Sequence, residues 1–246
     1  GGPPNEERLR HSTVDINDGR QSMGILNSFS FILEGKNGKD NYIENIRRRT
    51  EGQAAAITGF IKFVHKNRQE IKDIVGKGRE ELVSGKNPEV IIRMEHVEGD
   101  QPLSINLLSE FSGKDTVLQI KNYHPVVKPL LKVRKPAGYL ISKNDMDLLN
   151  IIKNHNISFD EYTFNEEDKI IRYFISEIDS IYLEGQWLPD PVIEEIMLPE
   201  TEVKDCFFIP TNQLKGNMLV LAFEPQSMLG LGIYESVYGH LVNFLS

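Results

Sequence analysis

The sequence predicts an α+β protein, and three observations support this fold class. Apolar residues in the N-terminal part recur at helical spacing, as at Ile57, Phe60, Ile61 and Val64. From Glu89 onward the pattern changes to short apolar runs bounded by turn residues, which is typical of strands. One more helical pattern, over 144–155, lies inside this strand-rich part. We therefore expect a strand–helix part, residues 1–85, followed by a β-rich domain with one packed helix, residues 86–246.

Composition excludes some classes of function. The 246 residues carry a formal net charge of −8 with 39% hydrophobic residues, and the mean hydropathy is −0.34. An acidic chain without a basic stripe does not fit nucleic-acid binding. No apolar run approaches the roughly 18 residues of a membrane span. The one cysteine, Cys206, can form no internal disulfide and belongs to no metal-binding Cys cluster. The oligomeric state does not follow from the sequence.

The first part contains a predicted strand and a predicted long helix. Residues 28–33 are mostly apolar, as expected of a strand buried on both faces. The helix, or two helices, should extend from residue 42 to about residue 84, with a capping box formed by Asn41 and Glu44. We expect a break in this helix near Gly76, because glycines interrupt the pattern there.

The second part reads as strands joined by turns. The predicted strands are 90–94, 116–120, 138–141, 171–177, 179–184, 192–198, 206–209, 217–223 and 231–234. A polar stretch separates the first two of these strands, and an extended, proline-marked stretch follows the second. This spacing indicates an antiparallel sheet or sandwich with the helix at 144–155 packed on it.

Glu34 is the most informative single residue, since it directly follows the predicted strand. A carboxylate at the end of a buried strand loses hydration unless it is paired or opens on a cleft. A carboxylate in a cleft can serve as a general base and acid. The alternative is an acid that faces solvent or the N-terminus of the following helix.

Local motifs of known catalytic sites are absent from the sequence. The six histidines are far apart, and the sequence contains no HExxH pair, no GxSxG, no phosphate loop and no GxGxxG. On sequence chemistry alone, the chain carries no complete active site.

A resemblance gives Glu34 a specific meaning. The stretch DGRQSMGILNSFSFILEGKNGKDNYIENIRRRTEGQAAAI resembles the last part of the catalytic domain of zinc carboxypeptidases of the carboxypeptidase A-like (funnelin) family. In that family a central strand ends in a Glu that is the general base and acid, and a long helix follows. The matching residues are Arg20, Gly24, Phe29, Phe31, Ile32, Leu33 and Glu34. The rest of the chain is similar to the β-rich extension of certain bacterial members.

The resemblance also implies what this chain lacks. The family's zinc ligands are an HxxE pair and a distant His that precede the catalytic strand, and no HxxE occurs here. His11 is a candidate for the third ligand, although it lies closer to Glu34 than the family leads us to expect. The family's substrate-closing tyrosine has no counterpart, since no Tyr precedes Tyr42. Arg20 has the geometry to bind a substrate carboxylate bidentately, and a loop salt bridge is its alternative role.

The sequence thus predicts the C-terminal portion of a zinc-dependent metallocarboxypeptidase-like hydrolase of peptide bonds. Glu34 would supply the base, zinc would be held by ligands outside this chain, and the chain alone would be inactive. The resemblance favours an extracytoplasmic location, since similar bacterial enzymes are often exported. Two alternatives stay open: a degenerate peptidase kept as a scaffold, and a non-catalytic β-rich module that binds a glycan, a peptide or a partner protein. In such a module Trp187 could stack on a ligand, whereas its alternative role is that of a core aromatic.

Overall fold

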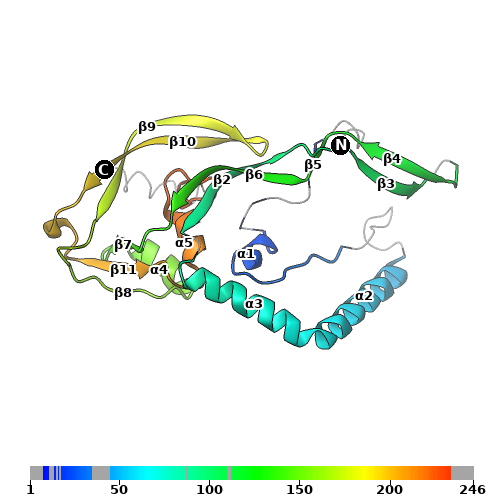
Figure 1. Cartoon of the computed structure of the whole chain (residues 1–246), viewed down its shortest axis with the longest axis horizontal. Helices are drawn as coiled ribbons and strands as arrows, with labels where there is room; N and C mark the ends of the chain where they lie inside the picture. The colour runs from blue at the N-terminus through cyan, green and yellow to red at the C-terminus, as the bar shows by residue number, and fades with distance from the viewer. Residues whose placement is uncertain are drawn as a thin grey trace.

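The computed structural model describes residues 8–10, 14, 16, 18–34, 45–86, 88–109 and 112–233. The chain contains both helices and small open sheets, largely in separate stretches (Figure 1), which confirms the α+β class. The helices are α1 (Gln21–Gly24), α2 (Ile46–Lys66), α3 (Arg68–Val83), α4 (Met146–Asn154) and α5 (Gly216–Phe223), with 3-10 turns η1 (Glu200–Glu202) and η2 (Leu231–Ile233). The strands are β1 (Leu9–Arg10), β2 (Glu89–Val97), β3 (Leu103–Leu108), β4 (Asp115–Ile120), β5 (Tyr123–His124), β6 (Val126–Arg134), β7 (Gly138–Ser142), β8 (Asp160–Glu161), β9 (Ile171–Leu183), β10 (Gln186–Met197) and β11 (Cys206–Pro210).

The long helical region is two helices that meet at Asn67, not near Gly76 as predicted. The side-chain amide of Asn67 donates to the carbonyl oxygen of Phe63 at 2.8 Å, a local bond that ends the first helix. Gly76 and Gly78 both lie inside α3. A Cβ at Gly78 would lie 3.1 Å from the Asn27 amide nitrogen, so that glycine allows a close approach to the helix. The capping box at residues 41–44 falls outside the described residues.

The strands form two long hairpins and one three-stranded sheet. Strands β2 and β6 pair antiparallel, and β3 and β4 extend the same hairpin (Figure 1). Strands β9 and β10 form the second hairpin, and β11 pairs between β7 and β8. The short β1 lies parallel to β5. The predicted antiparallel pairing is confirmed for every described pair except β1–β5, but the strands form several small sheets instead of a single sheet or sandwich. The sequence pattern also missed β3 and divided β9 into two strands.

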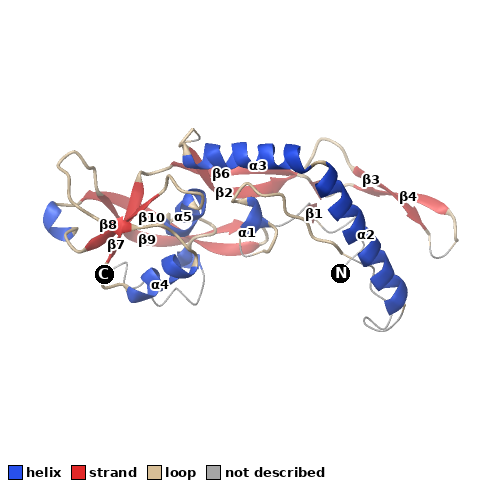
Figure 2. Cartoon of the chain, turned by 90° about the horizontal axis from the view of Figure 1, so that it is seen from below, coloured by secondary structure: helices blue, strands red, loops and turns tan. Residues whose placement is uncertain are grey.

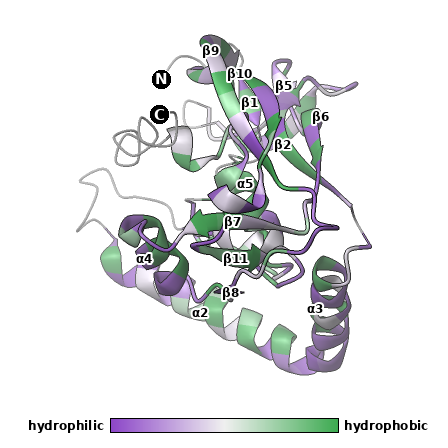
Figure 3. Cartoon of the chain, turned by 90° about the vertical axis from the view of Figure 1, so that its left-hand side faces the viewer, coloured by the Kyte–Doolittle hydropathy of each residue, from purple (hydrophilic) through white to green (hydrophobic). Residues whose placement is uncertain are grey.

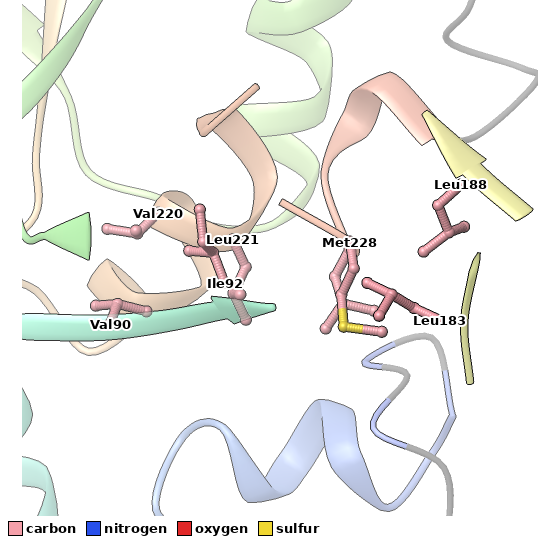
Figure 4. Close-up of a cluster of buried hydrophobic side chains, with 8 residues drawn as sticks. Val90, Ile92, Leu183, Leu188, Val220, Leu221 and Met228 are labelled. Carbon is pink, nitrogen blue, oxygen red and sulfur yellow. The ribbon is translucent and has the colours of Figure 1, made fainter. Parts of the chain in front are cut away.

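The core consists of two apolar clusters that share α5. Val220 and Leu221 of α5 pack with Val90 and Ile92 of β2 and with the turn end of the β9–β10 hairpin (Figure 4). Leu219 packs in the second cluster, between β7, β11 and α4. Residues 217–223 were predicted to be a strand, and this prediction is wrong because a short, uniformly apolar run does not distinguish a buried strand from a buried helix. The predicted strand at 231–234 is likewise wrong where it is described, since Leu231–Ile233 is a 3-10 turn.

Helices α2 and α3 differ from this core, because neither contains a buried residue. They run along one side of the molecule and end where the strand-rich part begins (Figures 1 and 2). The change from helix to strand falls between Val83 and Glu89, close to the predicted boundary. That the two parts are separate domains stays a prediction. Within the described ranges, none of the helices combines the length and apolar composition needed to cross a membrane.

Candidate functional site

The segment that ends in Glu34 is extended but is not a strand. Residues 28–34 pair with no described strand, and Phe29, Phe31, Ile32 and Leu33 are 51–68% exposed. The prediction of a buried strand at 28–33 is therefore wrong for the described chain. The residue types favour a strand, but a strand also requires hydrogen-bonding neighbours. Glu34 itself is exposed.

Side chains hold this segment against the two long helices. The amide of Asn27 donates to the carbonyl oxygen of Gly78 at 2.6 Å, in α3. Arg79 donates to the Leu26 carbonyl at 3.3 Å and to the Ser28 hydroxyl at 2.7 Å. Further along, the ring of Phe31 meets Phe60 of α2 edge to face, at 5.4 Å between centroids. These contacts fix the path of the segment that leads to Glu34.

Apolar side chains gather beside this segment. Ile57, Phe60 and Ile61 of α2 recur at helical spacing and are 48–61% exposed. Hydrophobic bands alternate with hydrophilic ones along α2 in Figure 3. What we name the apolar surface consists of these three α2 residues together with Phe29, Phe31, Ile32 and Leu33. Contiguous exposed apolar patches can serve as sites of interaction, and Glu34 directly follows the mostly apolar run 29–33 in the chain.

Arg20 lies in the loop that precedes α1. Its guanidinium group forms a salt bridge to Asp18, 3.2 Å from Nη2 to Oδ2, and its backbone N–H donates to the same carboxylate at 2.7 Å. These interactions hold the pKa of the Asp18 carboxyl below its usual value. The structure thus has Arg20 in the loop salt bridge. Within the described residues, Arg20 and Glu34 make no contact with each other, and a role of Arg20 in substrate binding stays a prediction.

The candidate metal ligand His11 lies outside the described residues. In the described ranges there is no group of three or more His, Cys, Asp or Glu side chains that could hold a metal ion. That the zinc ligands lie outside this chain stays a prediction.

A polar cluster that sequence reasoning missed surrounds Glu184. Glu184 and Gly185 form the β9–β10 turn, and both have positive φ angles, 51° and 89°. The Glu184 side chain is only 6% exposed; it accepts the His96 backbone N–H at 2.5 Å and lies 3.1 Å from His96 Nδ1. Arg8 and Arg10 each bring a guanidinium nitrogen within 3.3 Å of it. The cluster joins the N-terminal β1 to both hairpins.

A second acid, Glu224, is buried at the end of α5. Its carboxylate accepts a hydrogen bond from the Tyr139 hydroxyl at 2.7 Å, and it also bonds with Tyr173. Burial raises the pKa of Glu224, and the nearby charge of Glu195 raises it further. The hydrogen bonds from Tyr139 and Tyr173 act to lower this pKa but do not outweigh burial. Burial and the Glu224 charge raise the pKa of Tyr173 to about 12. At 5% exposure, Glu224 is closed to a substrate and serves the core.

Trp187 is exposed, contrary to a role in the core. It faces Tyr182 across the β9–β10 hairpin, with ring centroids 5.3 Å apart, and the two residues are 69% and 58% exposed. Successive side chains of a strand point to opposite faces of the sheet. The sequence neighbours Leu183 and Leu188 are buried in the core, so Tyr182 and Trp187 face outward. An exposed aromatic pair can stack on a ligand.

Comparison with protein-family models, with curated proteins and with solved structures finds no match. The fold is thus defined at the level of its class, and the function must be argued from the residues.

Proposed function

We propose that this chain is the C-terminal portion of a zinc-dependent metallocarboxypeptidase-like hydrolase of peptide bonds, with Glu34 as its general base and acid. One observation carries the proposal: Glu34 ends a segment fixed on α2 and α3, and it directly follows the apolar surface. The resemblance of residues 18–57 to the family supports the same role for the same residue.

In this chemistry Glu34 would contribute its carboxylate, and zinc held by ligands outside this chain would polarise the scissile carbonyl and activate the water. The ionised group accepts a proton from the water that attacks the scissile carbonyl, and it then donates that proton to the leaving amine. Such proton transfer requires a distance of about 2.6–3.2 Å between the heavy atoms. The exposed position of Glu34 leaves it open to a substrate and to a covering partner.

On this proposal the zinc ligands lie outside this chain, as the resemblance implies. A body that carries the metal ligands would cover the apolar surface and close the site beside Glu34. Covering would also exclude water, which strengthens electrostatic interactions in an active site. The chain alone would then supply the base without the metal.

The test is Glu34→Gln in the zinc-loaded peptidase that contains this chain. Glutamine keeps the size of the side chain but cannot accept the proton, so kcat/KM should fall at least about 100-fold. Zinc content should stay unchanged. Glu166→Gln, at an exposed acid of the β-rich part, is the matched control and should retain activity. Activity that survives Glu34→Gln would exclude Glu34 as the base.

A second candidate function rests on the exposed Tyr182–Trp187 pair. On this alternative the chain is a β-rich binding module that recognises a glycan, a peptide or a partner protein through this pair. The same experiment separates the two, because a binding module has no hydrolysis that Glu34→Gln could remove.

A further inference from the structure

The β3–β4 hairpin projects from the body of the molecule as an arm. Strands β3 and β4 pair only with each other, and the arm lies at one end of the molecule in both Figure 1 and Figure 2. Leu107, Leu108 and Val117 of the arm are 43%, 68% and 56% exposed. A two-stranded hairpin without further packing is marginally stable in water. Pairing with a further strand would therefore stabilise the arm.

The outer edges of β3 and β4 both pair with no described strand. The chain of β4 continues into β5, which pairs with β1, and β4 itself carries the charged Asp115. The edge of β3 has neither feature. The register of β3 with β4 is continuous and contains no bulge. Proteins protect open edges with charged side chains, prolines or bulges, because unprotected edges pair with other strands.

Charge singles out β3 as an edge that can meet its own copy. Among the described strands longer than five residues, β3 (Leu-Ser-Ile-Asn-Leu-Leu) is the one without a charged side chain. By contrast, the open edge strand β6 carries Lys128, Lys132 and Arg134. A two-fold axis brings a strand against itself, so any charge near its centre faces a like charge and opposes pairing.

We propose that β3 pairs antiparallel with β3 of a second copy of this chain, across a two-fold axis near Asn106. The two arms then form one four-stranded sheet in the order β4, β3, β3, β4. The open backbone N–H and C=O groups of β3 gain partners. One face of this sheet joins the apolar residues Leu103, Ile105 and Leu107 of both copies, because successive side chains alternate between faces. This dimer is independent of the proposed peptidase function.

The test is sedimentation of the full chain over a wide range of protein concentration. The unaltered chain should sediment at twice its mass of 28.1 kDa. Asn106→Lys and Asn106→Glu each place like charges across the axis, at an exposed position, and each should raise the dimer Kd at least about fivefold. An equimolar mixture of the two variants should restore the dimer, because opposite charges then meet.

Val117→Lys is the matched control. Val117 lies directly opposite Asn106 in the hairpin, on the same face, but one strand further from the axis. The exposed lysine should therefore leave the dimer Kd unchanged. An unaltered chain that stays monomeric contradicts the proposal. A dimer that Asn106→Lys does not weaken also contradicts it, and pairing through the apolar surface would give that result. Equal weakening of the dimer by Val117→Lys and Asn106→Lys contradicts it as well.

Discussion

Replacing Gly216 by alanine should lower the free energy of unfolding by more than about 4 kcal/mol, among the largest effects of single substitutions. A Cβ at this position would lie 1.8 Å from the carbonyl oxygen of Thr211 and 2.8 Å from Lys135 Nζ. The lysine end could move, but the backbone oxygen could not without displacing the start of α5. Since α5 supplies side chains to both apolar clusters, its displacement would disturb the whole core.

Denaturant unfolding followed by circular dichroism measures this effect. Gly59→Ala is the matched control, since it is also a helical glycine but has no atom within 4 Å of its added Cβ. Alanine has the higher helix propensity, so this control should leave stability unchanged or raise it by up to about 1 kcal/mol. Equal stability of the Gly216→Ala variant and the unaltered chain would show that α5 does not approach Thr211 as closely as described.

Replacing Glu184 by alanine should cost about 3 kcal/mol, because it removes the acceptor at the centre of a largely buried ionic cluster. The His96 backbone N–H would lose its 2.5 Å bond, and Arg8 and Arg10 would lose a nearby negative charge. Burial acts to raise the pKa of Glu184, but the hydrogen bonds and charge of His96 and the charge of Arg8 outweigh it, and the pKa is lowered.

The pH dependence of stability tests the same cluster. A lowered pKa in the folded state means that Glu184 contributes its full stabilisation above the unfolded value, near 4.5, and loses it as the pH falls through the folded value. The free energy of unfolding of the unaltered chain should therefore fall with acidification below about pH 4.5 more steeply than that of Glu184→Ala. If the free energy of unfolding depended on pH in the same way for both proteins, Glu184 would not stabilise the fold through this cluster.

The sequence predicted features that depend on local pattern and missed those that depend on distant contacts. The helical spacing at Ile57, Phe60 and Ile61 predicted α2 correctly, because that pattern lies within one turn of the chain. The helix break was misplaced, because Gly78 serves a contact with Asn27, about fifty residues away. The strand predicted before Glu34 requires a neighbouring strand, and residue types alone do not show whether one is present.

The candidate site follows the same division. Glu34 was found from its place after an apolar run and from the resemblance, both of which are readable locally. The cluster of Glu184 with His96, Arg8 and Arg10 joins three distant parts of the chain. The one signal for this cluster in the sequence was the Glu184-Gly185 pair, which is compatible with a tight turn. In the structure Glu184 adopts the left-handed conformation, which is uncommon for Glu. Nothing in the sequence pattern connected that turn to His96.

We propose that Glu34 acts beside an apolar surface that a metal-carrying body covers. Hydroxyl-radical oxidation read by mass spectrometry tests this proposal, on this chain and on the longer zinc-loaded peptidase that the proposal requires. Phe29, Phe31 and Phe60 should be oxidised readily in the chain and protected in the peptidase. Phe174, 46% exposed on β9, should react similarly in both. Equal oxidation of the three phenylalanines in both proteins would contradict the claim.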